Sequence, residues 1–315
     1  MELSMSNKFH SGTKLICIGE AMLELSLDNA GNASTRFAGD TLNTAVYLQR
    51  LCGDFAKISY CTVVGDDALS ERMVNFIESE HIDVSSIDRI SDSTIGLYAI
   101  TTDLEGERSF TYWRSESAAK SLFQTDGKTD FGILRQYEVV YLSAITLAIL
   151  AAPVRLELLE YLTALRNKQA ITLAFDSNYR PALWESQSIA RSTIESFWKI
   201  TDIALPSIDD EQALFDEQDE KSVLSRFKSY GITQGVLKRG AVGPIGLCSD
   251  AITLSKNELT AVHPVDTTAA GDSFNAGYLS AILKGSTQRE ALLAGHECAA
   301  RVITHHGAIV PISDW

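Results

Sequence analysis

Short apolar segments alternate with longer amphipathic segments along most of this 315-residue chain, and this alternation constrains the fold more than any other feature. The first apolar segment, residues 14–18, ends at Gly19 and predicts a buried strand. Further strands are predicted at residues 58–64, 139–142, 171–175, 203–205 and 235–237. Helices are predicted at residues 41–51, 67–80, 153–166, 189–199, 223–230, 273–283 and 288–305. This pattern predicts an α/β fold, in which a parallel sheet has helices on both faces.

Two segments, residues 22–37 and 95–114, depart from the alternation because they contain strand-like residues without intervening helices. Within the second, Asp103-Leu104-Glu105-Gly106 predicts a turn between two strands of a hairpin. We expect these pieces to form a small β-sheet lid that can close over a substrate and exclude water. An ordinary surface hairpin is the alternative. The main domain is expected to span residues 14–311, after a polar N-terminal extension at residues 1–13.

The composition excludes several classes of function. The formal net charge is −14, whereas a general nucleic-acid-binding protein needs a basic face for the phosphates. A few placed Arg or Lys residues would therefore have to bind any anionic substrate. No segment approaches the roughly 18 consecutive apolar residues of a membrane span, and residues 1–13 do not resemble a signal peptide. The five cysteines form no CxxC pair, which favours buried reduced thiols in a cytoplasmic protein.

The segment with the clearest chemistry leads into the helix predicted at residues 273–283. It reads Asp266-Thr267-Thr268-Ala269-Ala270-Gly271-Asp272-Ser273-Phe274. The small residues Ala269, Ala270 and Gly271 allow the backbone to approach a ligand, and N–H groups at a helix N-terminus favour an anion. Asp272 could accept a proton from an attacking hydroxyl, or it could be only a charge in the first turn. No GxxxxGK[ST] motif is present, so a P-loop is excluded.

This segment resembles the C-terminal signature of the ribokinase (PfkB-type) family of carbohydrate kinases, and four further landmarks follow the family's order. They are Gly19-Glu20, Gly39-Asp40-Thr41-Leu42-Asn43, Val64-Gly65-Asp66-Asp67 and Lys238-Arg239-Gly240. The resemblance covers residues 14–311. It implies a ribokinase-like three-layer sandwich with a mostly parallel central sheet and a small β-sheet lid. It also implies ATP-dependent phosphorylation of a sugar hydroxyl.

The resemblance implies roles for individual residues. Asp272 would be the catalytic base, and Ala269, Ala270 and Gly271 would form the anion hole. Gly39, Asp40 and Asn43 would contact the sugar, although Asp40 could also simply cap its helix. The nucleotide would lie near Lys238, Arg239, Gly240, Ala241, Gly243, Thr268, Gly271 and His296, where a packed histidine is the alternative for His296.

The expected metal site departs from the family pattern. Where the family often has Asn-x-x-Glu, this chain has Ser207-Ile208-Asp209-Asp210. Asp210 is expected to act on Mg²⁺ through water, because Mg²⁺ retains several of its waters. Ser207 does not replace the amide, so the metal arrangement is left open. A requirement for K⁺ near the anion loop is also left open.

Within the family, the chain is most similar to kinases of the sugar acid 2-keto-3-deoxygluconate. The similarity lies in residues 37–43, Tyr112-Trp113-Arg114, residues 176–181 and residues 266–272. It implies that Arg114 and Arg180 bind the substrate carboxylate and that Tyr98 and Tyr112 line the same pocket. The alternatives are a fructokinase or another neutral-sugar kinase, and a non-catalytic sugar-binding relative. The lid strands could also pair between subunits of a homo-oligomer.

Overall fold

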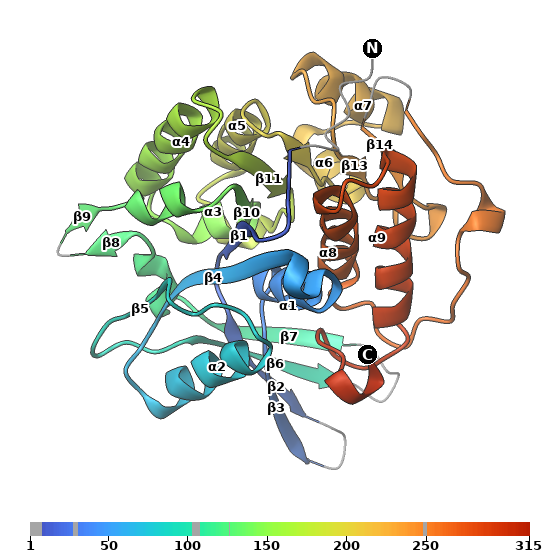
Figure 1. Ribbon diagram of the computed structural model, residues 1–315. Helices are drawn as coiled ribbons and strands as arrows, with labels where there is room; N and C mark the ends of the chain where they lie inside the picture. Colours follow the sequence, from blue (N-terminus) through green and yellow to red (C-terminus); the bar gives the residue numbers. More distant parts are fainter. Residues whose placement is uncertain (1–7, 28–30, 103–107, 126, 248–250) are drawn as a thin grey trace.

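A central parallel sheet organises the molecule (Figure 1). The computed structural model describes residues 8–27, 31–102, 108–125, 127–247 and 251–315. The sheet has six strands in the order β12-β11-β10-β1-β4-β5, and every neighbouring pair is parallel. The strands are β1 (Thr13–Ile18), β4 (Ala56–Val64), β5 (Ile87–Arg89), β10 (Val139–Ser143), β11 (Thr172–Asp176) and β12 (Ile203–Ala204). Parallel neighbours place their carboxyl ends at one edge, where ligands of open α/β sheets bind.

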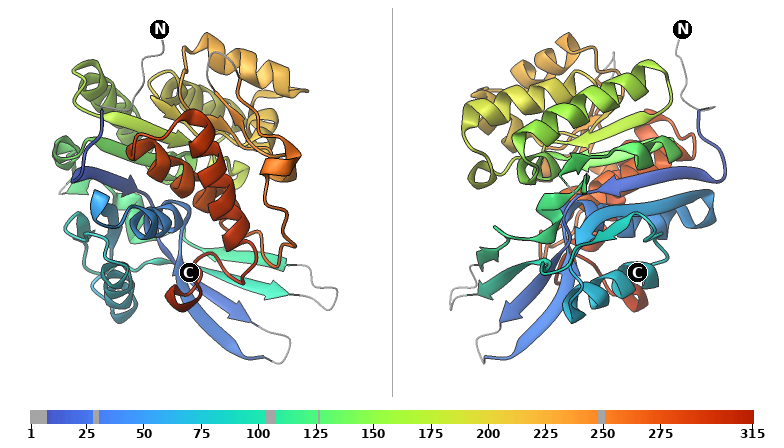
Figure 2. Two further views of the ribbon diagram at one scale, coloured as in Figure 1. Left: turned by 45° about the vertical axis from the view of Figure 1, so that its right-hand side comes forward. Right: turned by 90° about the vertical axis from the view of Figure 1, so that its left-hand side faces the viewer.

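Helices cover both faces of this sheet, as the two views in Figure 2 show. Along β1, Leu15 and Cys17 face one apolar core, whereas Ile16 and Ile18 face the other. The first core includes α1 (Asp40–Cys52), α2 (Ala68–Ser79), α8 (Ala270–Leu283) and α9 (Gln288–Val302). The second includes α3 (Ala144–Ile149), α4 (Ala152–Asn167), α5 (Gln187–Trp198), α6 (Ile208–Phe215) and α7 (Glu220–Ser229). The predicted three-layer α/β architecture is therefore confirmed.

The strand predicted at residues 235–237 lies beyond the six-stranded sheet. Here β13 (Val236–Leu237) pairs antiparallel with β14 (Ile245–Gly246). Isolated parallel bridges join Gly235 to Ala204 and Lys238 to Ser207. A Cβ at residue 235 would clash with the main chain of Ala204, so a glycine is needed for this close approach. The bridges bring Lys238 to the carboxyl edge of the sheet.

The lid segments form a separate sheet in the order β3-β2-β6-β7. Its strands are β2 (Met22–Leu27), β3 (Ala33–Ala38), β6 (Gly96–Thr102) and β7 (Arg108–Trp113). The antiparallel β6–β7 pair confirms the predicted hairpin, whose turn at residues 103–106 lies outside the described residues. In Figures 1 and 2 this sheet projects from the main body. The strands β8 (Gln124–Thr125) and β9 (Lys128–Thr129) form a two-stranded antiparallel ribbon that belongs to neither sheet.

One face of the lid is turned toward the main body. The strand register places Glu24 opposite Tyr98, and Tyr98 opposite Tyr112. Tyr98 belongs to a small apolar cluster that also includes Ala308 and Ala269. The base of the lid therefore contacts both the C-terminal segment and the loop before α8, where the catalytic chemistry was predicted.

No helix among the described residues is long and apolar enough to cross a bilayer. Cys17, Cys52, Cys61 and Cys298 are buried free thiols, as predicted, while Cys248 lies outside the described residues. Burial raises the pKa of Cys52 to about 11, which keeps this thiol protonated and unreactive.

Candidate active site

The loop before α8 makes a tight turn that is held by Asp266. One oxygen of Asp266 accepts hydrogen bonds from the Thr268 main-chain N–H (2.9 Å) and hydroxyl (2.7 Å). The other accepts from the Gly307 N–H at 2.7 Å. Ala269 has a φ of 61°, in the left-handed region, and is the N-cap of α8. This turn leads the chain directly into a helix N-terminus, the kind of backbone that can bind an anion.

The predicted anion-hole residues contribute differently at this turn. The Ala270 N–H donates to Thr267 O at 3.2 Å, so this donor is already used within the loop. Gly271 follows in the first turn of α8, and a Cβ placed there would lie 3.6 Å from Lys238 Nζ. The space next to Gly271 therefore borders a cation, which favours a phosphate at this position. The anion hole stays a prediction.

Asp272 lies in the first turn of α8 and is bound from α1. Asn43 Nδ2 donates to Asp272 Oδ2 at 2.8 Å, and Thr44 Oγ1 donates to Asp272 O at 3.2 Å. Burial raises the pKa of Asp272 to about 8, helped by the negative charges of Asp40 and Asp176 and opposed by Asn43 and Lys238. A carboxyl that titrates near neutral pH is suited to general base catalysis.

Asp40 begins α1 but does not cap it. The N-cap residue is Gly39, and no side-chain cap bond is made there. The Asp40 carboxylate instead accepts hydrogen bonds from Asn178 Nδ2 (2.9 Å) and from Ser143 Oγ. Burial raises its pKa. Asp40 thus lies where the carboxyl ends of β10 and β11 meet α1, close enough to influence Asp272.

Gly39 is tightly enclosed, which leads to a testable prediction. A Cβ at this position would clash with the main-chain carbonyl oxygen of Glu20. We expect Gly39→Ala to displace α1 from Glu20, to lower stability by about 2–3 kcal/mol and to raise the KM for the sugar. Thermal unfolding and initial-rate kinetics would measure both effects. Gly132→Ala is the control, since its Cβ would meet only the flexible side chain of Asp130. Equal behaviour of the two variants would contradict the prediction.

Lys238 is the centre of a buried polar network. Its Nζ donates to Asp176 Oδ1 and to Asn275 Oδ1, both at 3.0 Å. Asn275 Nδ2 donates in turn to Asp176 Oδ2 (2.6 Å) and to Tyr141 OH (3.1 Å). The network joins the ends of β11 and β13 to α8. Sequence analysis placed Lys238 near the nucleotide phosphates but missed Asp176 and Asn275 as its partners.

The other residues predicted on the nucleotide side lie farther along the same edge. Arg239 Nε donates to Gly243 O (2.8 Å), and its Nη1 pairs with Glu220 (2.6 Å). Ala241 lies in a short 3₁₀ turn, Gly240–Val242. His296 Nε2 lies 3.1 Å from Thr260 O. Arg239 and His296 thus have protein partners, and the nucleotide contacts of all these residues stay predictions.

The lid brings three of the predicted sugar-binding residues to one face. Tyr98 and Tyr112 are opposite each other, with ring centroids 5.7 Å apart. Arg114 follows β7, and its Cβ lies beside Gly96, which shares a face of β6 with Tyr98. Tyr98 OH donates to Glu24 Oε2 at 2.5 Å, and burial and Glu24 raise the pKa of Tyr98. Arg114 forms a buried ion pair with Glu20. Glu20 and Glu24 lie four residues apart after the first strand, separated by three apolar residues, and the sequence analysis gave neither of them a role in the site.

Arg180 lies in the loop after β11, four residues beyond the end of that strand at Asp176. Its Nη1 donates to Tyr179 O (2.9 Å) and lies 3.5 Å from Asp210 Oδ1. The side chain is about half exposed, at 54%. Burial raises the pKa of Asp210 to about 6, while Arg180 opposes the shift and Asp176 adds to it. No contact among the described residues joins Arg180 to Arg114.

The donor set fits Mg²⁺ held mainly by water and phosphate. No three His, Cys, Asp or Glu side chains within the described ranges gather closely enough to hold a metal ion directly. Asp210 is a largely buried carboxyl, with a side chain that is 19% exposed. Mg²⁺ commonly keeps several waters and uses one or two carboxylates with substrate phosphates. Asp210 is thus suited to a water-mediated role.

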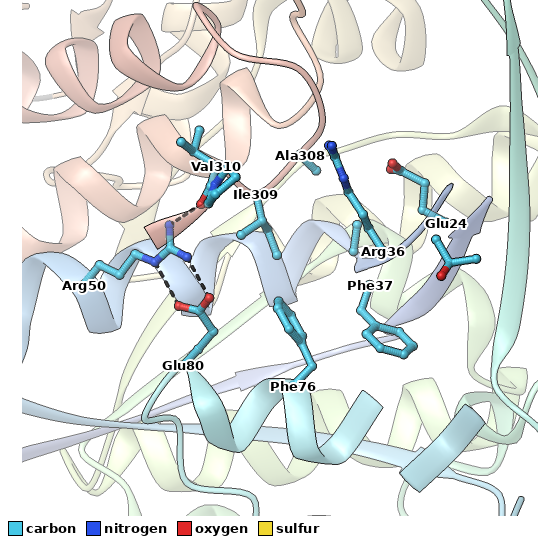
Figure 3. Close-up of a pocket in the computed structure, with 12 residues that line it drawn as sticks. Glu24, Arg36, Phe37, Arg50, Phe76, Glu80, Ala308, Ile309 and Val310 are labelled. Atoms are coloured by element: carbon cyan, nitrogen blue, oxygen red, sulfur yellow. Dashed lines mark hydrogen bonds and ion pairs between the residues drawn. The ribbon is translucent and has the colours of Figure 1, made fainter. Parts of the chain in front are cut away.

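A separate pocket of about 300 Å³ lies beside the C-terminal segment (Figure 3). Arg50 and Glu80 form a two-bond ion pair in its wall, at 2.6 and 2.9 Å. Phe37 and Phe76 contribute aromatic surface, with ring centroids 5.7 Å apart. Its lining residues do not include Asp272, Asp40 or Lys238. The residues predicted to carry the catalytic chemistry therefore lie outside the lining of this pocket.

Comparison with known proteins gives a consistent result. The family model for "pfkB family carbohydrate kinase" matches residues 12–315. The chain belongs to this family. The chain of this pfkB kinase is 40% identical to 2-dehydro-3-deoxygluconokinase of Dickeya dadantii, over 94% of this chain and 96% of that protein. It is 38% identical to the Escherichia coli K12 protein of the same name, over 95% and 97%. The crystal structure of 2-dehydro-3-deoxygluconokinase from Thermotoga maritima shares the fold, with a TM-score of 0.80 at 17% identity over 96% of each chain.

Proposed function

We propose that this pfkB kinase transfers the γ-phosphoryl group of ATP to the terminal hydroxyl of 2-keto-3-deoxygluconate, also called 2-dehydro-3-deoxygluconate. The product would be 2-keto-3-deoxy-6-phosphogluconate. The observation that carries the chemical part is Asp272, a carboxyl with a pKa of about 8 at a helix N-terminus beside Lys238. The substrate part is supported by relatives of that name at 38–40% identity and by the presence of Arg114 and Arg180.

The proposed step is an in-line transfer with Asp272 as the general base. The substrate hydroxyl oxygen forms a bond to the γ-phosphorus, its proton moves to an Asp272 carboxylate oxygen, and the bond from phosphorus to the ADP oxygen breaks. Asn43 holds the carboxylate in place through its 2.8 Å hydrogen bond. The main-chain N–H groups at the start of α8 and the Lys238 ammonium would stabilise the negative charge of the transferred group.

A sugar acid requires cations in this site because the site itself is acidic. Burial raises the pKa of Glu20, Asp40 and Asp272, and the neighbouring carboxylates Asp40 and Asp176 add to these shifts. An additional carboxylate would be repelled unless guanidinium groups compensated it. We assign this task to Arg114 and Arg180. A neutral sugar such as fructose would not need them, which is why the arginines discriminate between the proposed substrate and the fructokinase alternative.

ATP and Mg²⁺ are the proposed cosubstrate and metal. Mg²⁺, when bound with ATP, would offset negative charge on the phosphates, and Asp210 would contact its waters. Residues 238–243 and Thr268 would border the nucleotide. A K⁺ requirement, a cytoplasmic location and a homo-oligomer formed through the lid strands stay predictions.

An ADP-release assay with MgATP tests the substrate directly. The candidates are 2-keto-3-deoxygluconate, fructose, ribose and gluconate, each titrated to saturation. We expect kcat/KM for the keto-deoxy acid to exceed the others by at least about 10²-fold, because a paired charge in a buried site is worth several kcal/mol. Arg180→Gln should raise the KM for the sugar acid by at least about tenfold while leaving the KM for fructose unchanged.

Other outcomes of this assay would favour the alternatives. Preference for fructose or ribose, unaffected by Arg180→Gln, would keep the kinase chemistry and discard the carboxylate pocket. Absence of turnover with every sugar, in a folded protein that binds MgATP, would favour the non-catalytic relative. Asp272 argues against that last alternative, because a protein that only binds sugar has no use for a base at this position.

A further inference from the structure

Glu20 and Arg114 form a buried ion pair where the first strand leads into the lid. The Glu20 side chain is 1% exposed and that of Arg114 is 11% exposed. Glu20 follows Gly19 at the carboxyl end of β1, whereas Arg114 follows the last strand of the lid, β7. The pair therefore connects the main domain to the base of the lid across 94 residues of sequence.

The main chain of Glu20 is packed against α1, whereas its carboxylate is paired mainly with Arg114. The carbonyl oxygen of Glu20 packs against Gly39. Its Oε1 packs against Gly96, where any larger residue would clash with it. Within the described part of the chain, Oε1 has no hydrogen-bond partner. The Ser117 hydroxyl lies near enough to lower the pKa of Glu20, but its geometry does not meet that of a hydrogen bond. Arg114 is thus the principal partner of this buried charge.

Arg114 keeps donors for a second anion. A guanidinium has five N–H donors, and within the described part of the chain Arg114 donates to Glu20 through Nη2 alone. Its Cβ lies beside Gly96, on the lid face that carries Tyr98 and Tyr112. A long arginine side chain that is held at one nitrogen loses less entropy when its other edge binds a carboxylate.

We propose that Glu20 is a positioning residue for sugar-acid binding, because it holds Arg114 at the base of the lid with the remaining guanidinium donors directed to the substrate carboxylate. This inference rests on the proposed function. It assigns to Glu20 no contact with the reacting atoms, so its effect should fall on the KM for the sugar acid and not on kcat.

The test compares Glu20→Ala, Arg114→Gln and the double variant in the full-length enzyme. We expect Glu20→Ala to raise the KM for 2-keto-3-deoxygluconate by at least about tenfold, with kcat within about threefold and the KM for ATP unchanged. Arg114→Gln should raise the same KM at least as much. The double variant should be no worse than Arg114→Gln alone, since Glu20 acts through Arg114. Calorimetric titration of the sugar acid without ATP should give the same order of Kd values.

A matched control separates positioning from general destabilisation. Glu80→Ala breaks another buried ion pair, with Arg50, and should lower the Tm without changing the KM for the sugar acid. Glu20→Gln, which preserves side-chain size, replaces Glu20→Ala if the alanine variant does not fold. Its KM should also rise.

Two results would overturn the inference while leaving the proposed function intact. One is a wild-type KM in both folded Glu20 variants. The other is a double variant whose loss is the product of the two single losses, which would mean that Glu20 and Arg114 act independently. A wild-type enzyme without preference for the sugar acid would overturn the inference and the proposed function together.

Discussion

Asp272→Asn is expected to lower kcat by at least about 10³-fold, because the amide cannot accept the hydroxyl proton. The substitution preserves the shape of the side chain. Asn43 can still donate to the amide oxygen at position 272, so α1 and α8 should remain packed. Circular dichroism and nucleotide binding would verify the fold, and single-turnover measurements would give the rate of the chemical step. A folded variant with kcat within about tenfold of wild type would remove Asp272 from the role of base.

The same substitution has a predictable effect on stability. Because the pKa of Asp272 is raised to about 8 from an ordinary value of 3.8, the folded state binds its proton more tightly than the unfolded state. Wild-type stability from this group is therefore present at low pH and is lost as pH rises between about 4 and 8. Asp272→Asn lacks this loss, so its Tm should exceed that of wild type increasingly from pH 5 to pH 8.5. A constant or reversed difference would contradict the assigned pKa.

The kcat/KM of the wild-type enzyme should depend on the pKa of the same carboxyl. The base must be ionised to accept a proton, so kcat/KM should rise with pH up to about 8 in the free enzyme. Rate measurements across pH 5.5–9, with the sugar well below its KM, would test this. A profile that is flat across this range would indicate that another group governs the reaction.

Lys238→Met is expected to have the second large effect. The substitution leaves the Asp176 carboxylate buried without its cation, which costs about 3–5 kcal/mol for a broken buried pair. The Tm should fall accordingly, by about 2–4 °C for each kcal/mol. Because Lys238 lowers the pKa of Asp272, its removal should also shift the rise of kcat/KM to higher pH. Differential scanning calorimetry and the pH profile measure the two effects separately.

Two further variants make the Lys238 prediction specific. Asp176→Asn combined with Lys238→Met removes both charges and should recover part of the lost Tm, but not the activity. Lys228→Met on the exposed face of α7 is the control for removing a lysine and should change neither quantity. A Lys238→Met variant with wild-type Tm would show that the network contributes little to the fold.

Local patterns were sufficient to predict most of the fold. The alternation of strands and helices predicted the parallel sheet. Each strand or helix could be recognised from the spacing of apolar residues within its own segment, every two residues or every 3.6. The loop at residues 266–272 was recognisable for the same reason, since small residues and Asp272 are adjacent in sequence. Residues 235–237 were correctly predicted as a strand, but not their pairing with Ile245–Gly246, which depends on how closely Gly235 approaches Ala204.

The contacts that tune the site were not predictable in this way. Asp176 and Lys238 are 62 residues apart, Asn43 and Asp272 are 229 apart, and nothing local marks them as partners. The pKa of Asp272 is raised by burial and by the nearby charge of Asp40. Both the burial and the proximity arise only when the chain folds. Family resemblance supplied Arg114 as a candidate, but the buried Glu20 that holds it was visible only from the packing.

The C-terminal segment has a consequence for the order in which the kinase is assembled. Gly307 binds Asp266 under the anion loop, Arg36 of the lid donates to His306 O at 3.0 Å, and Tyr47 of α1 donates to Ala308 O at 2.8 Å. Three walls of the site therefore share supports within residues 306–308. During synthesis on the ribosome, the lid strands and α1 are made long before these supports. A nascent chain would thus complete its sheet first and acquire a competent site only after residues 306–308 have emerged from the exit tunnel.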